Sequence, residues 1–234
     1  MSDPRERLIV ALDVSSAAAA QKIVAAVGDS ALTYKVGMQL YTAEGPQVVR
    51  DLVASGRQVF LDLKYHDIPN TVASAVREAA TLGVSLLTIH AGGGGKMTRA
   101  AVEAAGTSST KILAVTVLTS LDENDLNSTG VPGRVIDQVL RLAALAISSG
   151  CDGVVSSAHE TPELRRELGN DFLIVNPGVR PLGSDHGDQA RVVTPAQAIA
   201  CGATHIVVGR PITGAKDPAG EARAILGQMS AAPN

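Results

Sequence analysis

Two carboxylates and one amine lie close enough in one short segment to act together in acid–base chemistry. Asp62, Lys64 and Asp67 occur where an apolar run ends and a helix is expected to begin at Pro69. Residues two apart on a strand point to the same face, so Asp62 and Lys64 are expected side by side. Burying an acid and an ammonium group is costly unless they pair. Because coupled charges cluster at active sites, this segment is the first candidate for catalysis.

The elements that must position this segment alternate along the chain. Short β-branched runs predict strands at 8–13, 32–38, 58–64, 86–91, 112–118, 153–157, 172–178 and 205–210. Helical composition and start signals predict helices at 15–27, 42–55, 69–82, 95–105, 134–149, 160–168, 194–201 and 218–229. Strands that are apolar on both faces suit a parallel sheet covered by helices. The order therefore predicts an α/β fold, a single (β/α)₈ TIM barrel.

An open, doubly wound sheet is the alternative architecture. The first predicted strand is not followed by Gly-x-Gly-x-x-Gly, which disfavours the dinucleotide-binding version of that fold. No proline- or serine-rich linker divides the chain, so residues 1–234 are expected to form one catalytic domain.

Composition excludes several classes of partner. Hydrophobic residues make up 45% of the chain and the net charge is −3, with no block of like charge, so neither nucleic acid nor an anionic membrane is an expected partner. Aromatic residues are only 2%, which argues against base stacking. Cys151 and Cys201 are expected to be buried, reduced thiols. With no signal-peptide core and no uncharged stretch of membrane-spanning length, we expect a cytoplasmic protein.

Polar residues gather where the predicted strands end. In a TIM barrel the carboxyl ends of the strands form the functional face, so these side chains are expected around one mouth. Taken singly, each could be a helix cap or a solvated rim charge. The residues in question are Asp13, Lys35, Asp62, Lys64, His90, Thr119, Ser120, Arg180 and Arg210.

Two glycine–arginine turns follow the seventh and eighth predicted strands. Arg180 lies in Asn-Pro-Gly-Val-Arg-Pro and Arg210 in Val-Gly-Arg-Pro. An exposed backbone N–H beside a guanidinium fork suits phosphate, and these two loops are the recurrent phosphate site of TIM barrels. The alternative is an ordinary turn glycine beside a surface arginine. Residues 181–191 have no strand or helix period, which fits either a closing lid or a disordered loop.

Together these motifs resemble the orotidine 5′-phosphate decarboxylase family. The resemblance rests on Asp62-Leu-Lys64-Tyr-His-Asp67-Ile-Pro-Asn-Thr71 and on the turns around Arg180 and Arg210. Asp-x-Lys-x-x-Asp is shared with a wider superfamily, whereas the His-Asp-Ile-Pro-Asn-Thr extension and the Pro-Gly-Val-Arg-Pro turn are specific to the decarboxylase.

The resemblance implies conversion of orotidine 5′-monophosphate to uridine 5′-monophosphate and CO₂, the last step of UMP biosynthesis. It implies a homodimer that works without metal or organic cofactor, with each active site shared across the interface. Lys64 would protonate C6, and Lys35, Asp62 and Asp67 would complete an alternating charge network. Asp67 and Thr71 would reach in from the partner subunit.

The resemblance also implies which residues bind the nucleotide. Asp13 and Lys35 would contact the ribose, and Thr119 the pyrimidine. The phosphate side would be held by Arg180, Gln189, Gly209 and Arg210.

Two other functions remain open at this point. A hexulose-phosphate synthase or keto-gulonate-phosphate decarboxylase shares Asp-x-Lys-x-x-Asp but passes through an enediolate and uses Mg²⁺. A non-catalytic phosphate-ligand binding protein could be built on the same scaffold. Magnesium dependence would indicate the first, and an Ala variant of Lys64 that changes only affinity would indicate the second.

Overall fold

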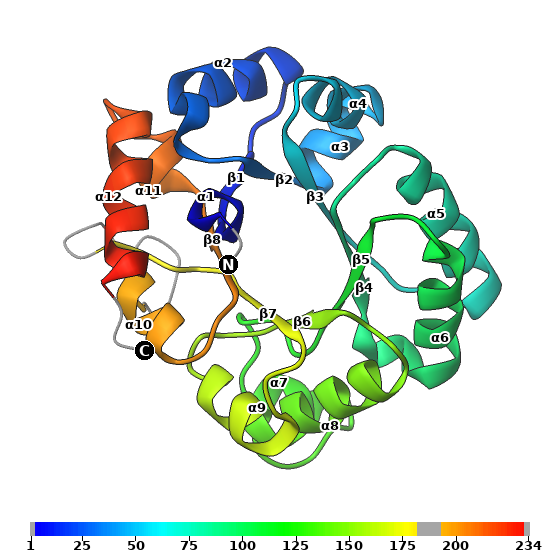
Figure 1. Ribbon diagram of the computed structural model, residues 1–234. Helices are drawn as coiled ribbons and strands as arrows, with labels where there is room; N and C mark the ends of the chain where they lie inside the picture. The colour runs from blue at the N-terminus through cyan, green and yellow to red at the C-terminus, as the bar shows by residue number, and fades with distance from the viewer. Residues whose placement is uncertain (1–2, 182–192, 232–234) are drawn as a thin grey trace.

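The computed structural model is a closed barrel of eight parallel strands surrounded by helices (Figure 1), which confirms the predicted TIM barrel. It describes residues 3–181 and 193–231. Each strand pairs with the next in the chain, and β8 closes on β1 with Val10 opposite Val208. The strands are β1 (Leu8–Ala11), β2 (Thr33–Gly37), β3 (Gln58–Tyr65), β4 (Leu86–His90), β5 (Lys111–Val115), β6 (Gly153–Val155), β7 (Leu173–Asn176) and β8 (His205–Val208).

Helices cover the outside of the barrel, and α1 lies across its amino-terminal end (Figure 1). Two of them begin at caps visible in the sequence: the Ser16 hydroxyl accepts the N–H of Ala19 at 3.2 Å, and Asp217 accepts that of Gly220 at 2.9 Å. The helices are α1 (Pro4–Arg7), α2 (Ala17–Val27), α3 (Met38–Glu44), α4 (Gln47–Ala54), α5 (Pro69–Thr81), α6 (Gly94–Ala105), α7 (Glu123–Ser128), α8 (Val135–Ser148), α9 (Thr161–Leu168), α10 (Pro195–Ala200), α11 (Arg210–Thr213) and α12 (Pro218–Ser230), with 3₁₀ turns η1 (Gly28–Ser30) and η2 (Ala91–Gly93).

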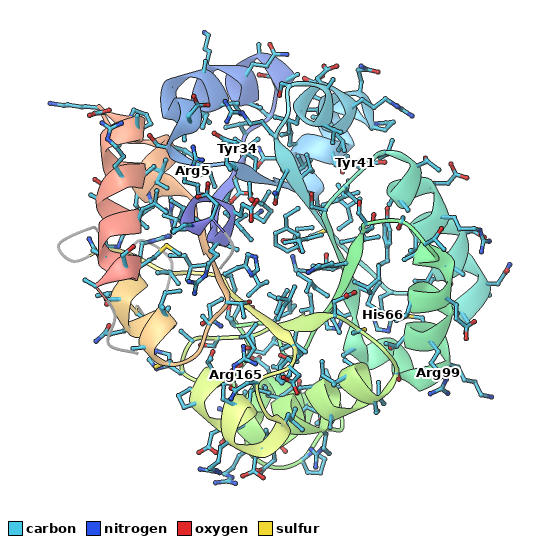
Figure 2. All side chains as sticks on the ribbon, viewed as in Figure 1. Arg5, Tyr34, Tyr41, His66, Arg99 and Arg165 are labelled. Carbon is cyan, nitrogen blue, oxygen red and sulfur yellow. The ribbon has the colours of Figure 1, made fainter. Side chains whose placement is uncertain are left out.

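Alternation along each strand produces two apolar layers. One set of side chains fills the barrel interior (Figure 2), and the other packs against the helices. On β3, for example, Phe60 faces inward while Leu61 and Leu63 face the helix layer. Apolar side chains therefore fill the barrel interior. Inward-facing polar side chains can line the barrel mouth only beyond these apolar layers, near the carboxyl ends of the strands. The interior set is Ile9, Ala11, Phe60, Leu86, Leu113, Val115, Val155, Val175 and Val207.

The structure corrects some predicted boundaries. The single helix expected at 42–55 is two helices, because Gly45 ends α3 in a left-handed conformation (φ 67°) and Pro46 precedes α4. Arg210 was expected to end the eighth strand but instead begins α11. β1 ends at Ala11, before Asp13, which is exposed in the following loop. The short helices α1, α7 and α11 were not expected, since four to six residues show no clear period.

The two cysteines are free, as expected from the sequence. Cys151 is buried, and desolvation raises the pKa of its thiol to about 12, so it is a packing residue. Cys201, expected to be buried, is only half-buried, because it caps the end of α10. Among residues 3–181 and 193–231, none of the helices is both long and apolar enough to cross a membrane.

The amino-terminal end of the barrel holds a histidine that should link stability to pH. Burial, with the charges of Arg7 and Lys111, lowers the pKa of His205 from 6.5 to about 4, and its Nδ1 lies 2.9 Å from Thr204 Oγ1. The unfolded chain therefore binds this proton more readily than the folded chain. We expect full stability above about pH 6.5 and a loss of about 3 kcal/mol as the pH falls through 4.

Urea unfolding between pH 7 and pH 4 measures this dependence. His205→Asn keeps a polar group near Thr204 but cannot be protonated, so its stability should fall less steeply over the same range. Equal slopes for the two proteins would contradict the assignment to His205.

Candidate active site

Four side chains of alternating charge lie in a row at the carboxyl ends of β1, β2 and β3. Lys35 Nζ is 2.8 Å from Asp13 Oδ1 and 4.0 Å from Asp62 Oδ2. Lys64 Nζ is 2.9 Å from both oxygens of Asp62. Asp62 and Lys35 side chains are each only 12% exposed, so each charge depends on its neighbours for compensation. The predicted pairing of Asp62 with Lys64 is confirmed.

Strand register explains why these residues meet. Ala11 pairs with Lys35 and Gly37 pairs with Asp62, so Asp62 lies one inward position closer to the mouth than Lys35, whose Nζ lies 4.0 Å from it. Gly37 also leaves room for the amine, since a Cβ there would lie 3.0 Å from Lys35 Nζ. Lys64 lies within β3 but departs from the strand conformation: its φ is 52°, a left-handed conformation that costs a non-glycine residue about 1–3 kcal/mol. Strain of this kind persists only where the surroundings enforce it.

A cavity of about 420 Å³ joins three members of this row, Asp13, Lys35 and Asp62, to the two predicted arginines; Lys64 is not among its lining residues and meets it through Asp62. Arg180 is 6% exposed, and desolvation together with the charge of Arg210 lowers the pKa of its guanidinium. An anion between the two arginines would compensate the desolvation of Arg180 and the repulsion between the two guanidinium groups. This end of the cavity therefore favours a dianionic group such as phosphate. The cavity is lined by Ala11, Asp13, Lys35, Asp62, Pro177, Gly178, Arg180, Val207, Gly209, Arg210 and Thr213.

A pair of histidines lies beside Lys64. His66 stacks on His90 with ring centroids 5.4 Å apart and an interplanar angle of 22°; Figure 2 labels His66 on the side of the barrel covered by α5 and α6. Burial, with the charges of His66 and Lys64, lowers the pKa of His90. Its Nδ1 is buried and has no hydrogen-bond partner among the described residues. Both observations favour a neutral His90, which adds no positive charge next to Lys64.

Other predicted site residues lie outside the row of charges. Asp67 and Thr71 are exposed around the start of α5, and Asp67 Oδ1 accepts the N–H of Ile68 at 2.6 Å. Thr119 is exposed in the segment after β5. Gln189 and most of the predicted lid lie outside the described residues. Within the described part of one chain, then, Asp67 and Thr71 do not join Lys64.

Sequence reasoning missed Thr213, which lines the cavity, and a polar residue that contacts the row of charges. Thr88 is fully buried on β4, and its hydroxyl lies between Asp62 and Lys64. The signal was available: Thr88 shares a strand face with His90, so it is a polar residue on an inward position of an otherwise apolar strand.

Comparison with known proteins places the chain in a family. A model of the orotidine 5′-phosphate decarboxylase / HUMPS family matches residues 6–225. Orotidine 5′-phosphate decarboxylase of Anaeromyxobacter dehalogenans is 52% identical over 222 residues, covering 95% of this chain and 97% of the relative. The chain belongs to this family.

Further members of the orotidine 5′-phosphate decarboxylase family agree in sequence and structure. The decarboxylase of Afipia carboxidovorans is 51% identical over 231 residues, which cover 99% of this chain and 97% of that protein. The crystal structure of orotidine 5′-phosphate decarboxylase from Lactobacillus acidophilus superimposes with a TM-score of 0.87 at 40% identity and covers 97% of this chain and 100% of that chain. Fold and family therefore agree with the expectation from the motifs.

Removing the shared carboxylate should destabilise the site more than removing an outer one. Asp62→Ala leaves the ammonium group of Lys64 without its carboxylate partner and near that of Lys35, which keeps only the exposed Asp13, and we expect a loss of about 2 kcal/mol, below the about 3–5 kcal/mol of fully buried pairs. Asp13→Ala should cost about 0–1 kcal/mol, because the Asp13 side chain is 62% exposed. Urea unfolding compares the variants.

A double variant separates charge repulsion from lost packing. Adding Lys64→Ala to Asp62→Ala removes the ammonium group that lost its partner, so part of the lost stability should return. A double variant less stable than Asp62→Ala would show that packing dominates.

Proposed function

We propose that this chain is an orotidine 5′-phosphate decarboxylase, which converts orotidine 5′-monophosphate to uridine 5′-monophosphate and CO₂. Residues 1–234 would act as one catalytic domain, at the last step of UMP biosynthesis. The observation that carries the proposal is the row Asp13–Lys35–Asp62–Lys64, whose first three members line a cavity that ends at two arginines. A cytoplasmic, reducing setting fits the free thiols of Cys151 and Cys201.

The reaction needs a fixed cation at the carbon that loses CO₂. Departure of CO₂ leaves an electron pair on C6 of the pyrimidine, and no cofactor is required if an ammonium group stabilises that charge and then gives it a proton. Lys64 is suited to this step, because Asp62 accepts two contacts from its Nζ and holds it in place. The proton goes to C6, and the amine regains one from water.

The energies involved indicate that stabilisation of the carbanion by Lys64 lowers the barrier more than repulsion between Asp62 and the substrate carboxylate does. Asp62 near the substrate carboxylate would raise the energy of the bound substrate by about 4 kcal/mol, for two unit charges at 4 Å and an effective dielectric constant of 20. Enzymes lower barriers by about 8–23 kcal/mol. Most of the effect must therefore come from the interaction of Lys64 with the developing negative charge.

The other parts of the nucleotide would lie along the cavity, each against its own set of residues. Asp13 and Lys35 would contact the ribose, between the row of charges and the arginines, and Thr119 the pyrimidine. At the other end, phosphate would bind Arg180, Gln189, Gly209 and Arg210. Phosphate binding far from C6 can contribute to the chemical step, because it orders the groups around the substrate.

We also propose a homodimer that shares its active sites. Met38, Ile68 and Leu118 are 56%, 67% and 36% exposed, and each follows the carboxyl end of a strand on this face of the barrel. Exposed large apolar side chains around a charged mouth suit a second copy of the same face. Asp67 and Thr71 lie next to Ile68 in the chain, so such a copy could bring them to its partner's Lys64.

Turnover of orotidine 5′-monophosphate, followed by ultraviolet absorbance, tests the function. Wild-type protein should be active and remain so in EDTA. Lys64→Ala should lose at least about 10³-fold in kcat, since the proton donor and the charge stabiliser are both removed. Lys22→Ala, on the exposed side of α2, is the matched control and should match the wild type.

Each rival function predicts a different result in this assay. Activity that requires Mg²⁺ and is lost in EDTA would favour a hexulose-phosphate synthase or keto-gulonate-phosphate decarboxylase. A wild-type protein that binds the nucleotide without releasing CO₂ would favour a non-catalytic binding protein. Full turnover by folded Lys64→Ala would exclude the proposed role of Lys64.

Mixed dimers test the shared site. Lys64→Ala and Asp67→Ala chains are each expected to be inactive alone, but half of randomly mixed dimers carry one intact site of two, so about a quarter of wild-type activity should return. A mixture of Lys64→Ala with the Lys64→Ala/Asp67→Ala double variant is the control and should stay inactive. No recovery in the first mixture would contradict the shared site.

A further inference from the structure

Strands β3 and β4 lose their regular register at the site. Leu61 pairs with Leu87 and Tyr65 pairs with Ile89, so β3 takes four residue steps where β4 takes two. A single β4 residue, Thr88, therefore lies opposite the extra length of β3. Extra residues in one strand interrupt the ladder of backbone hydrogen bonds and leave N–H groups that need other partners.

Thr88 provides one of those partners. The backbone N–H of Lys64, the residue with φ 52°, donates to Thr88 Oγ1 at 2.9 Å. A hydroxyl group can accept this bond without the fixed geometry of a ladder carbonyl, because it is carried on a rotatable side chain. The left-handed conformation of Lys64 is thus held at its backbone by a side chain of the neighbouring strand.

The same hydroxyl has a second bond, and its direction is determined by chemistry. Thr88 Oγ1 lies 3.0 Å from Asp62 Oδ1. A backbone N–H can only donate and an ionised carboxylate can only accept, so the single hydroxyl proton points to Asp62. Thr88 is fully buried, so bulk solvent does not reach its hydroxyl. One oxygen atom therefore joins the backbone of Lys64 to the carboxylate that holds its amine.

We propose that Thr88 is a positioning residue of the active site, whose hydroxyl fixes the Lys64 backbone and the Asp62 carboxylate relative to each other. It touches neither substrate nor the reacting carbon and acts through the two charged residues. Without the hydroxyl, Lys64 loses the bond that holds its left-handed backbone, and Asp62 loses the donor that orients Oδ1. Catalytic groups displaced by about 1 Å lose about 10²-fold in rate.

The inference rests on the proposed decarboxylation for its kinetic test only. Thr88→Val keeps the shape of the side chain and removes the hydroxyl. It should lower kcat about 10–100-fold while KM for orotidine 5′-monophosphate changes less than about threefold, because phosphate and ribose contacts lie elsewhere. Thr88→Ser keeps the hydroxyl and should retain at least about a third of the wild-type kcat.

Two comparisons separate positioning from simple loss of packing. Thr110→Val removes another buried threonine hydroxyl, which donates to Val84 O at 2.8 Å just before β5 begins, and it should leave kcat within about twofold of wild type. Should Thr88→Val fold poorly, the pair Thr88→Ser and Thr88→Ala repeats the comparison with smaller side chains. Kinetics are measured well below the melting temperature of each variant.

Amide exchange at Lys64, measured by NMR, tests the inference without turnover. The Lys64 N–H should exchange at least about tenfold faster in Thr88→Val than in wild type, and within about threefold of wild type in Thr88→Ser. Unchanged exchange in Thr88→Val, or an unchanged kcat in an active protein, would overturn the role of Thr88. A wild-type protein with no turnover but with Thr88-dependent exchange would instead overturn the proposed function and leave the contact established.

Discussion

The Asp62 carboxylate is the group on which the site depends. It accepts both contacts of Lys64 and lies 4.0 Å from Lys35, so one negative charge compensates two positive charges in a largely buried position. Without Asp62, Lys64 would lose its carboxylate partner and Lys35 would keep only the exposed Asp13, beside a cavity that is also lined by Arg180 and Arg210. Such an arrangement costs folding energy, and it is kept where ready-oriented charges serve a bound ligand.

The barrel offsets this folding cost because the side chains that stabilise it and the charged side chains of the site occupy different parts of the fold. Its interior is filled with apolar side chains, and in its closed ladder each of the strands β1 to β8 pairs with a neighbour on both sides. The amino-terminal end can then hold a half-buried His205 with a lowered pKa, while the carboxyl ends of β1, β2 and β3 hold the ionised row. Rigid strands matter here because charges at hydrogen-bond distance lose their effect if their carriers shift by about 1 Å.

Periodicity and end signals predicted most of the fold. The eight strands and their order follow from β-branched runs separated by helices, because only parallel pairing buries strands that are apolar on both faces. Boundaries were less predictable. Gly45 and Pro46 divide one expected helix, and Arg210 starts a helix where a strand was expected to end. Both places carry local signals, because Gly45 and Pro46 end one helix before the next begins and a proline stands in the first turn of α11.

Residue types and spacing by themselves determined that this chain forms a barrel, that its charges gather at the carboxyl ends of the strands, and that Asp62 pairs with Lys64. These features follow from local alternation and strand order. Only the tertiary structure decided that Lys64 leaves the strand conformation, that Thr88 bridges it to Asp62, and that Arg180 is buried beside Arg210. The reason is that each depends on register between segments distant in the chain, and no single segment encodes the register of its neighbour.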